Sequence, residues 1–212
     1  MVGLAGRTRT RSAGLPARSS TSAVTMSVSE VFDRITSALG EAGIAYMLAG
    51  SLASAYYGAP RTTQDIDLVI AATADQLRTF VQSLPKDQYY VDLTAALEAH
   101  KHQSLFNVVD MATGWKIDMI IRKSRPFSEE EFRRRTLVNL QGRPLFVASA
   151  EDVVVSKLEW AKLAQSERHI EDVAGILRMR WDSLDRAYLE RWVLELRIEA
   201  EWNDARGAAG VQ

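Results

Sequence analysis

The sequence predicts an α/β protein of the α+β type, with a small mixed sheet flanked by helices and followed by a C-terminal helical bundle. Three observations predict this fold. Helical and strand-like patterns alternate over the first half of the chain, and one strand pattern, at 65–70, alternates acidic with apolar residues. Only helical patterns occur over roughly the last 60 residues. A sheet domain that continues into a helical region explains this order.

Composition excludes several classes of protein. The chain has 212 residues, of which 47% are hydrophobic and 25% charged, so it is neither wholly disordered nor a disulfide-stabilised miniprotein. It has no cysteine, which excludes thiolate metal centres, thiol nucleophiles and disulfides. The net charge of −1 does not indicate nucleic-acid or membrane binding. No apolar run reaches the ~18 residues of a membrane span, and we expect a cytoplasmic protein.

Residues 1–25 differ from the rest of the chain. They carry four arginines and no acidic residue, and they lack the apolar core of a secretory signal. We expect a disordered basic leader or translated upstream sequence before a start at Met26, with an organellar transit peptide as the alternative. We divide the remainder into a core at 26–125, a mostly helical region at 126–204 and a frayed tail at 205–212.

Hydrophobic spacing and turn residues define the elements of the core. Val31, Ile35 and Leu39 repeat at helical spacing, and Gly40 ends that helix. Glycine and proline separate most of the later segments, and the turn at 112–114 predicts a hairpin. The segments after the first helix are strand 45–48, helix 52–57, strand 65–70, helix 74–84, strand 89–91, helix 95–100, and strands 104–109 and 115–121.

The C-terminal region begins with a charged helix at 129–135, which we expect to face solvent with its acids and arginines paired one turn apart. A small hairpin at 137–140 and 144–148 follows. Ser149 and Asp152 form the pattern of a helix-capping box. Three helices are then predicted, at 153–164, 169–179 and 184–201.

Asp65 and Asp67 are the first candidate catalytic residues. Because alternate residues of a strand share a face, both carboxylates point to one side while Ile66 and Leu68 face the core. Paired carboxylates repel each other unless a cation lies between them, and their oxygens suit Mg²⁺ or Mn²⁺. Asp118 lies in another apolar strand, and an adjacent antiparallel strand would bring it beside Asp67 as a third ligand. A solvated edge strand is the alternative explanation of these acids.

Gly50 and Ser51 are the second feature. They follow a buried strand and begin a helix, so the backbone can approach a phosphate closely at the positive end of the helix dipole. The Ser51 hydroxyl adds a donor, although it could simply cap the helix. An anion cradle beside a metal site is the combination that nucleotidyl transfer requires, because that reaction depends on charge neutralisation and in-line positioning.

Gly50-Ser51, Asp65-x-Asp67 and the later Asp118 together resemble the signature of the polymerase-β-type nucleotidyltransferase superfamily. The string from Gly50 to Leu68 is most similar to the AbiEii/AbiGii-type nucleotidyltransferases, the toxins of toxin–antitoxin pairs. This resemblance implies a magnesium-dependent enzyme that moves an NMP group from an NTP to an acceptor hydroxyl, with an antitoxin as a protein partner. The acceptor could be an RNA 3′ end such as that of tRNA, a protein or a small molecule.

The resemblance also suggests nucleotide contacts outside the core motif. Lys157 matches a helix lysine of the family and would contact the triphosphate, or it could be a solvated surface lysine. Arg61 and Thr63 would bind nucleotide or only stabilise their loop. Arg168 and Asp172 are expected to pair on a helix surface. The rival functions are a non-catalytic binding module on the same fold and a small-molecule (antibiotic) adenylyltransferase.

Overall fold

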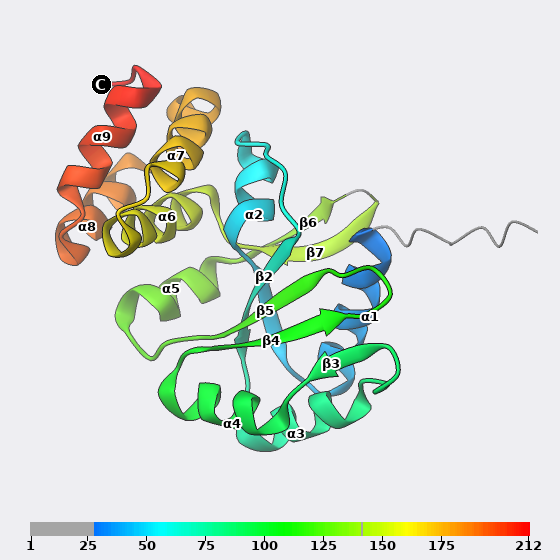
Figure 1. Ribbon diagram of the computed structural model, residues 1–212. Coiled ribbons are helices and arrows are strands. Elements are labelled where there is room, and N and C mark those ends of the chain that lie inside the picture. The colour runs from blue at the N-terminus through cyan, green and yellow to red at the C-terminus, as the bar shows by residue number, and fades with distance from the viewer. Residues whose placement is uncertain (1–27, 141) are drawn as a thin grey trace, which may run out of the picture.

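A computed structural model describes residues 28–140 and 142–212, and within them a seven-stranded mixed sheet has the order β3-β4-β5-β2-β1-β7-β6 (Figure 1). The leader at 1–25 lies outside the described residues. The strands are β1 (Ala45–Leu48), β2 (Asp65–Ala71), β3 (Tyr89–Val91), β4 (Leu105–Asp110), β5 (Lys116–Ile121), β6 (Thr136–Leu140) and β7 (Arg143–Val147). The helices are α1 (Val28–Glu41), α2 (Gly50–Tyr57), α3 (Ala74–Ser83), α4 (Leu93–His102), α5 (Pro126–Arg134), α6 (Ala150–Ala164), α7 (Glu167–Arg180), α8 (Arg186–Leu196) and α9 (Glu199–Ala209), with a short 3₁₀ helix η1 (Trp181–Ser183) after α7.

Both predicted hairpins are confirmed, but one predicted strand direction is wrong. β4 and β5 pair antiparallel, as do β6 and β7. In contrast, β2 and β5 pair in parallel, with Asp67 opposite Asp118, where we expected antiparallel pairing. Alternation of acidic and apolar residues determines which face a side chain occupies. It carries no information on strand direction, which here follows from the chain returning through α3, β3, α4 and β4 before β5.

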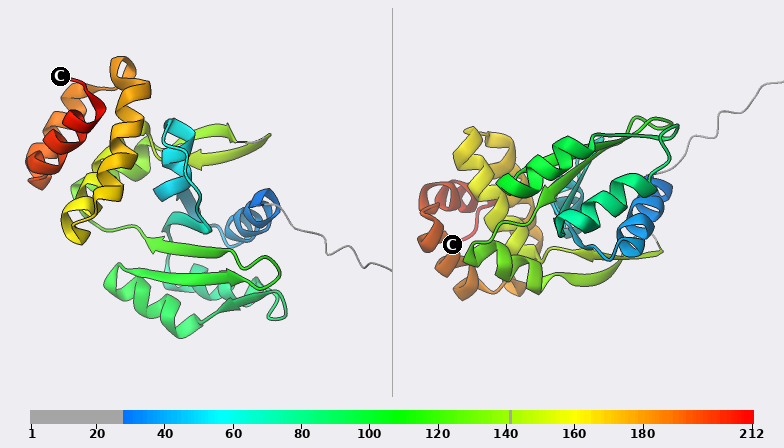
Figure 2. Two further views of the ribbon diagram at one scale, coloured as in Figure 1. Left: turned by 45° about the horizontal axis from the view of Figure 1, so that its top comes forward. Right: turned by 90° about the horizontal axis from the view of Figure 1, so that it is seen from below.

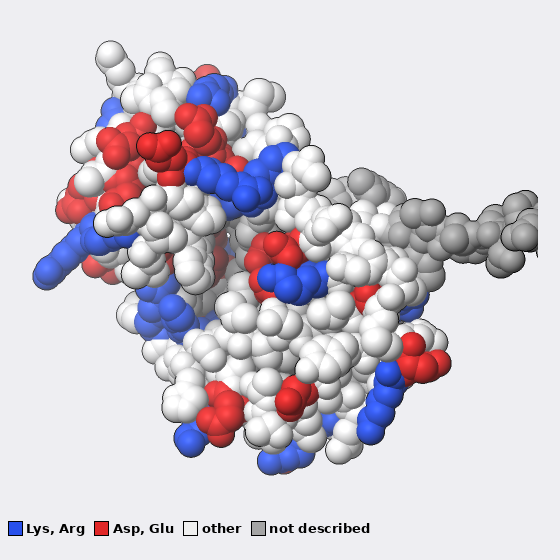
Figure 3. All heavy atoms as spheres, in the orientation of Figure 1, with Lys and Arg blue, Asp and Glu red and all other residues white. Residues whose placement is uncertain are grey.

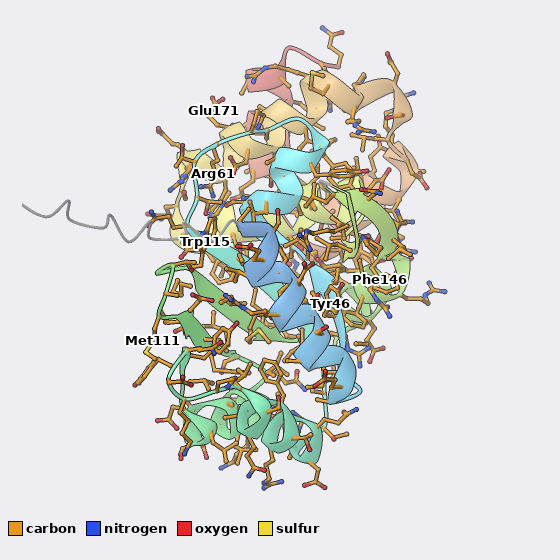
Figure 4. All side chains as sticks on the ribbon, turned by 90° about the vertical axis from the view of Figure 1, so that its right-hand side faces the viewer. Tyr46, Arg61, Met111, Trp115, Phe146 and Glu171 are labelled. Atoms are coloured by element: carbon orange, nitrogen blue, oxygen red, sulfur yellow. The ribbon has the colours of Figure 1, made fainter. Side chains whose placement is uncertain are left out.

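One face of the sheet is covered by helices that originate in the first half of the chain. α1 contacts β1 and α3, α3 contacts α4, and α4 contacts β4 (Figure 2). The apolar residues of the central strands face this layer, and Leu68 and Ile117 are fully buried. Between the neighbouring strands β1 and β7, Tyr46 packs edge-on against Phe146 with ring centroids 6.0 Å apart (Figure 4). The other face of β2 and β5 therefore remains available for polar residues.

The C-terminal helices α6–α9 form a group beside the sheet, and α2 lies between them and β2 (Figures 1 and 2). The single helix expected at 184–201 is in fact two helices, because Arg197 adopts a left-handed conformation between α8 and α9. α9 then continues to Ala209 with Ala205 fully buried, so helix extends into the segment expected to be frayed. No helix of the described ranges is long and apolar enough to cross a bilayer.

The helix expected to be solvated, α5, is instead half buried. Phe127, Glu131 and Phe132 are all buried, because the apolar residues of α5 form one face that packs into the protein. Arg134 forms its ion pairs with Glu151 and Asp152 of α6 rather than with an acid one turn earlier in α5. One of the expected pairs within α5 is present, between Arg133 and Glu130 at 3.8 Å, whereas Arg134 joins α5 to α6.

Candidate functional site

The paired aspartates of β2 lie on the face of the sheet that the helical layer leaves open. Ile66 and Leu68 are buried on the opposite side, which confirms the predicted orientation of the strand. Burial raises the pKa of Asp67, the neighbouring Asp118 carboxylate raises it further, and a hydrogen bond from the Ser51 backbone N–H opposes both effects. Asp67 is therefore a partly buried carboxylate that lies beside a second carboxylate and accepts a hydrogen bond from the start of α2.

β5 contributes Asp118 and a second charged residue that the sequence analysis did not single out. In the parallel register, Asp118 lies opposite Asp67 and Lys116 lies opposite Asp65. The Lys116 ammonium is 3.4 Å from the Asp65 carboxylate and 3.1 Å from that of Asp118. Its position two residues before Asp118 is a signal that could have placed it on the same face. Figure 3 shows acidic and basic side chains together over β2 and β5.

Gly50 is required by the position of Asp67. Its φ of +60° is in the left-handed region, and a β-carbon built on it would lie 1.9 Å from an Asp67 carboxylate oxygen. The Ala49 backbone N–H donates to the Asp67 carbonyl at 2.9 Å, which joins the end of β1 to β2. α2 begins at Gly50, so Ser51 lies in the first turn of the helix and is not its cap.

Two cations and a carboxylate connect α2 to the C-terminal helices. Arg61, on the loop after α2 (Figure 4), donates to the Ser51 hydroxyl and lies 3.3 Å from Asp172 of α7. Lys157 of α6 donates to the same carboxylate and is 4% exposed. Burial lowers the pKa of Lys157, although the hydrogen bond to Asp172 opposes that effect. The solvated alternative for Lys157 is therefore wrong, and so is the surface position expected for Asp172.

Thr63 has a local structural role in this arrangement. Its hydroxyl accepts a hydrogen bond from the Asp65 backbone N–H at 3.2 Å, so it fixes the start of β2. Arg168, in the first turns of α7, lines the same cavity as Thr63 and is not paired with Asp172 in the described hydrogen bonds and ion pairs.

Most of these side chains line one cavity of about 1030 Å³ between the open face of the sheet and the C-terminal helices, whereas Lys116 and Asp172 lie behind or beside its lining residues as their ion-pair partners. That volume is slightly above the ~300–1,000 Å³ typical of small-molecule sites. The cavity is lined by every residue predicted for catalysis, metal or nucleotide binding: Gly50, Ser51, Arg61, Thr63, Asp65, Asp67, Asp118 and Lys157.

The cavity has a second polar wall, formed by α5 and α6, that the sequence analysis missed. Arg125 forms two hydrogen bonds with the Glu159 carboxylate, at 2.6 and 2.5 Å. The buried Glu131 carboxylate accepts from the Ser156 hydroxyl at 2.8 Å, and burial raises its pKa to about 8. The amphipathic spacing of Phe127, Glu131 and Phe132 in α5 was the signal that could have located this wall.

The donor chemistry of the three carboxylates fits a hard divalent cation such as Mg²⁺ or Mn²⁺. Asp65, Asp67 and Asp118 are the residues that would hold it. Among residues 28–140 and 142–212, however, no group of three acidic or histidine side chains is already drawn together at metal-binding distances. The Lys116 ammonium instead lies within ion-pair distance of two of the carboxylates, those of Asp65 and Asp118.

Comparisons with known proteins identify the fold. No family model and no curated protein matches the chain. Among solved structures, the antibiotic-resistance factor ANT(2'')-Ia matches at 15% identity over 84% of this chain and 95% of its own, with a TM-score of 0.53. Its complex with adenylyl-2''-tobramycin matches at 15% identity over 81% and 97%, with a TM-score of 0.52. An antigenic nucleotidyltransferase-like protein from Paracoccidioides brasiliensis matches at 16% over 86% and 92%, also at 0.52. The chain therefore has the nucleotidyltransferase fold.

Proposed function

We propose that this protein transfers an NMP group from an NTP to an acceptor hydroxyl. In this reaction the acceptor oxygen attacks the α-phosphorus, the bond from the α-phosphorus to the bridging oxygen breaks, and pyrophosphate leaves. One observation carries the proposal: three carboxylates on two neighbouring strands face the same cavity as a buried lysine and the Gly50-Ser51 turn. The nucleotidyltransferase fold supports the same conclusion.

Each group at the cavity has a role in this proposal. Ser51 and the backbone at the start of α2 would bind the triphosphate, with Arg61 and Lys157 neutralising its charge. Thr63 would keep this loop in position. Asp65 and Asp67 would hold Mg²⁺ or Mn²⁺, which when bound supplies charge neutralisation at the phosphates.

Asp118 would complete the metal site and accept the proton of the attacking hydroxyl. It is suited to that step because it faces the cavity and already accepts a hydrogen bond from Asn107 of β4 at 2.5 Å, which orients the carboxylate. Removing the acceptor proton makes the oxygen a better nucleophile at the α-phosphorus.

Three cationic residues of the cavity that have no role in the steps above favour an anionic acceptor. Arg122, Lys123 and Arg168 line the cavity, whereas the Arg125–Glu159 pair in its wall is neutral overall. Trp160 is 52% exposed at the same cavity and offers an aromatic surface for stacking. Positive charge combined with an aromatic platform suits a single-stranded RNA end better than a polycationic aminoglycoside. We therefore propose an RNA 3′ end such as that of tRNA as the acceptor, in a toxin that a partner antitoxin restrains.

The direct test is transfer of label from α-labelled NTPs, with Mg²⁺ or Mn²⁺, to total tRNA, to protein and to tobramycin. Wild-type protein should label tRNA, and Asp67→Asn should not. Loss of activity in Asp67→Asn should occur without loss of stability, because burial already disfavours the charged carboxylate. Asp75→Asn, an exposed residue of α3, is the matched control and should label normally.

The remaining outcomes distinguish the rival functions. Labelling of tobramycin in preference to tRNA would show a small-molecule adenylyltransferase. Absence of labelling with every acceptor and every NTP would favour a non-catalytic binding module. For the toxin role, expression of the wild-type protein should arrest bacterial growth, while expression of Asp67→Asn should not; normal growth with both would contradict it.

A further inference from the structure

Lys116 occupies a position that the proposed reaction does not explain. It is the first residue of β5, and the pleat of the strand places it on the same face as Asp118, opposite Asp65 on β2. Its ammonium lies 3.4 Å from Asp65 and 3.1 Å from Asp118, within ion-pair distance of both carboxylates. The side chain is 42% exposed, so it has solvent on one side into which it can move.

In the metal-free protein the Lys116 ammonium reduces the repulsion among the three carboxylates, as a bound divalent metal would also do. Asp65, Asp67 and Asp118 lie on adjacent strands in register, and like charges this close destabilise the folded protein. Among the described ion pairs, Lys116 is the cationic partner of both Asp65 and Asp118. Lys157 instead hydrogen-bonds Asp172, and Arg61 lies beside the same carboxylate.

We infer that Lys116 is an internal counter-ion that a divalent metal must displace to bind, so that this lysine weakens metal binding while it stabilises the metal-free fold. This inference rests on the metal site of the proposed function. A bound Mg²⁺ requires carboxylate oxygens at about 2.0–2.1 Å, which leaves no space for an ammonium between the same oxygens. The long, flexible and partly exposed lysine can withdraw into solvent, whereas the aspartates are carried by paired inner strands of the sheet.

The expected size of the effect follows from the exposure of Lys116. Partly exposed ion pairs are weak, so we expect the two pairs of Lys116 together to lower metal affinity about fivefold, which corresponds to about 1 kcal/mol. Because the charge itself exchanges with the metal, an arginine at this position should retain most of the effect and a neutral residue should lose it.

The test measures Mn²⁺ binding in the absence of nucleotide, by the paramagnetic resonance signal of free Mn²⁺, together with the melting temperature of the metal-free protein. Lys116→Met should bind Mn²⁺ about fivefold more tightly than wild type and melt at a lower temperature without metal. Lys116→Gln provides a second neutral variant should the methionine variant not fold. Lys116→Arg should resemble wild type. Lys123→Met removes a lysine from the wall of the cavity that the three carboxylates face, and it controls for the general loss of positive charge.

Two results would overturn the inference, and they are distinguishable. If wild type and both neutral variants bind Mn²⁺ equally, or if the neutral variants bind more weakly, Lys116 does not compete with the metal, and the proposed function is unaffected. If none of these proteins binds Mn²⁺ at millimolar concentration, the metal site of the proposed function fails together with this inference.

Discussion

Glu131 should make the stability of this protein fall as pH rises, and Glu131→Gln should remove that dependence. The side chain lies on the buried face of α5, is 7% exposed and accepts a hydrogen bond from Ser156 of α6. Burial raises its pKa from 4.5 to about 8 in the folded protein. Glutamine has nearly the same shape and can still accept from Ser156, but it cannot ionise.

The sign follows from comparing the two states of the chain. Below pH 4.5 the carboxyl is protonated in both the folded and the unfolded protein, so it contributes no pH dependence. Between 4.5 and about 8 the unfolded chain releases the proton and the folded chain retains it, so the free energy of unfolding decreases as pH rises. At about 1.4 kcal/mol per pH unit, the total decrease approaches roughly 5 kcal/mol above pH 8.

Urea unfolding followed by tryptophan fluorescence, from pH 5 to pH 9, measures this difference. The two proteins should have similar stability near pH 5, and Glu131→Gln should be more stable by several kcal/mol near pH 8.5. Glu129→Gln, an exposed position of the same helix, should follow wild type at every pH. Parallel stability curves for wild type and Glu131→Gln would refute the reasoning, because they would show that Glu131 ionises normally in the folded protein.

Two further predictions concern Gly50, which lines the cavity, and Asp172, the partner of the cavity residue Lys157. Gly50→Ala should abolish label transfer, because the added β-carbon would displace Asp67. Gly142→Ala is the control, since Gly142 also has a positive φ but has no neighbour within 4 Å. It should lower stability by only about 1–2 kcal/mol through backbone strain and keep activity. Full activity of Gly50→Ala would contradict the packing. Asp172→Asn should lower the free energy of unfolding by about 3–5 kcal/mol in urea, since it removes the hydrogen-bonded carboxylate partner of the buried Lys157 ammonium; a loss below about 1 kcal/mol would show that the pair is dispensable.

The local sequence pattern predicted the strand and the turn that carry Asp65, Asp67 and Gly50. The period-2 alternation from Asp65 to Leu68 located β2 and its two faces, and glycine at position 50 located the turn from β1 into α2. Both signals act over a few residues: side-chain direction alternates along any strand, and only glycine tolerates a left-handed turn pressed against another side chain. The position of Asp118 in an apolar strand was predictable for the same reason.

Local pattern failed where the environment came from distant parts of the chain. The spacing of apolar residues in α5 was a sign of the buried face that carries Glu131, but the partners of Glu131 and Lys157 lie on other helices and cannot be read from neighbouring residues. The break between α8 and α9 at Arg197 was also missed, because no glycine or proline marks it. Each of these features depends on which helices pack together.

Periodicity and turn residues alone determined that two carboxylates share one face of a strand beside a glycine turn. Only the tertiary structure decided what neutralises and confines them: the parallel register that sets Lys116 against Asp65, and the packing of α6 and α7 that brings Lys157 to Asp172. The physical reason is the distance along the sequence over which each interaction acts. Backbone sterics and side-chain alternation operate between near neighbours, whereas the burial and pairing of a charge depend on segments that are distant in sequence and meet only when the chain is folded.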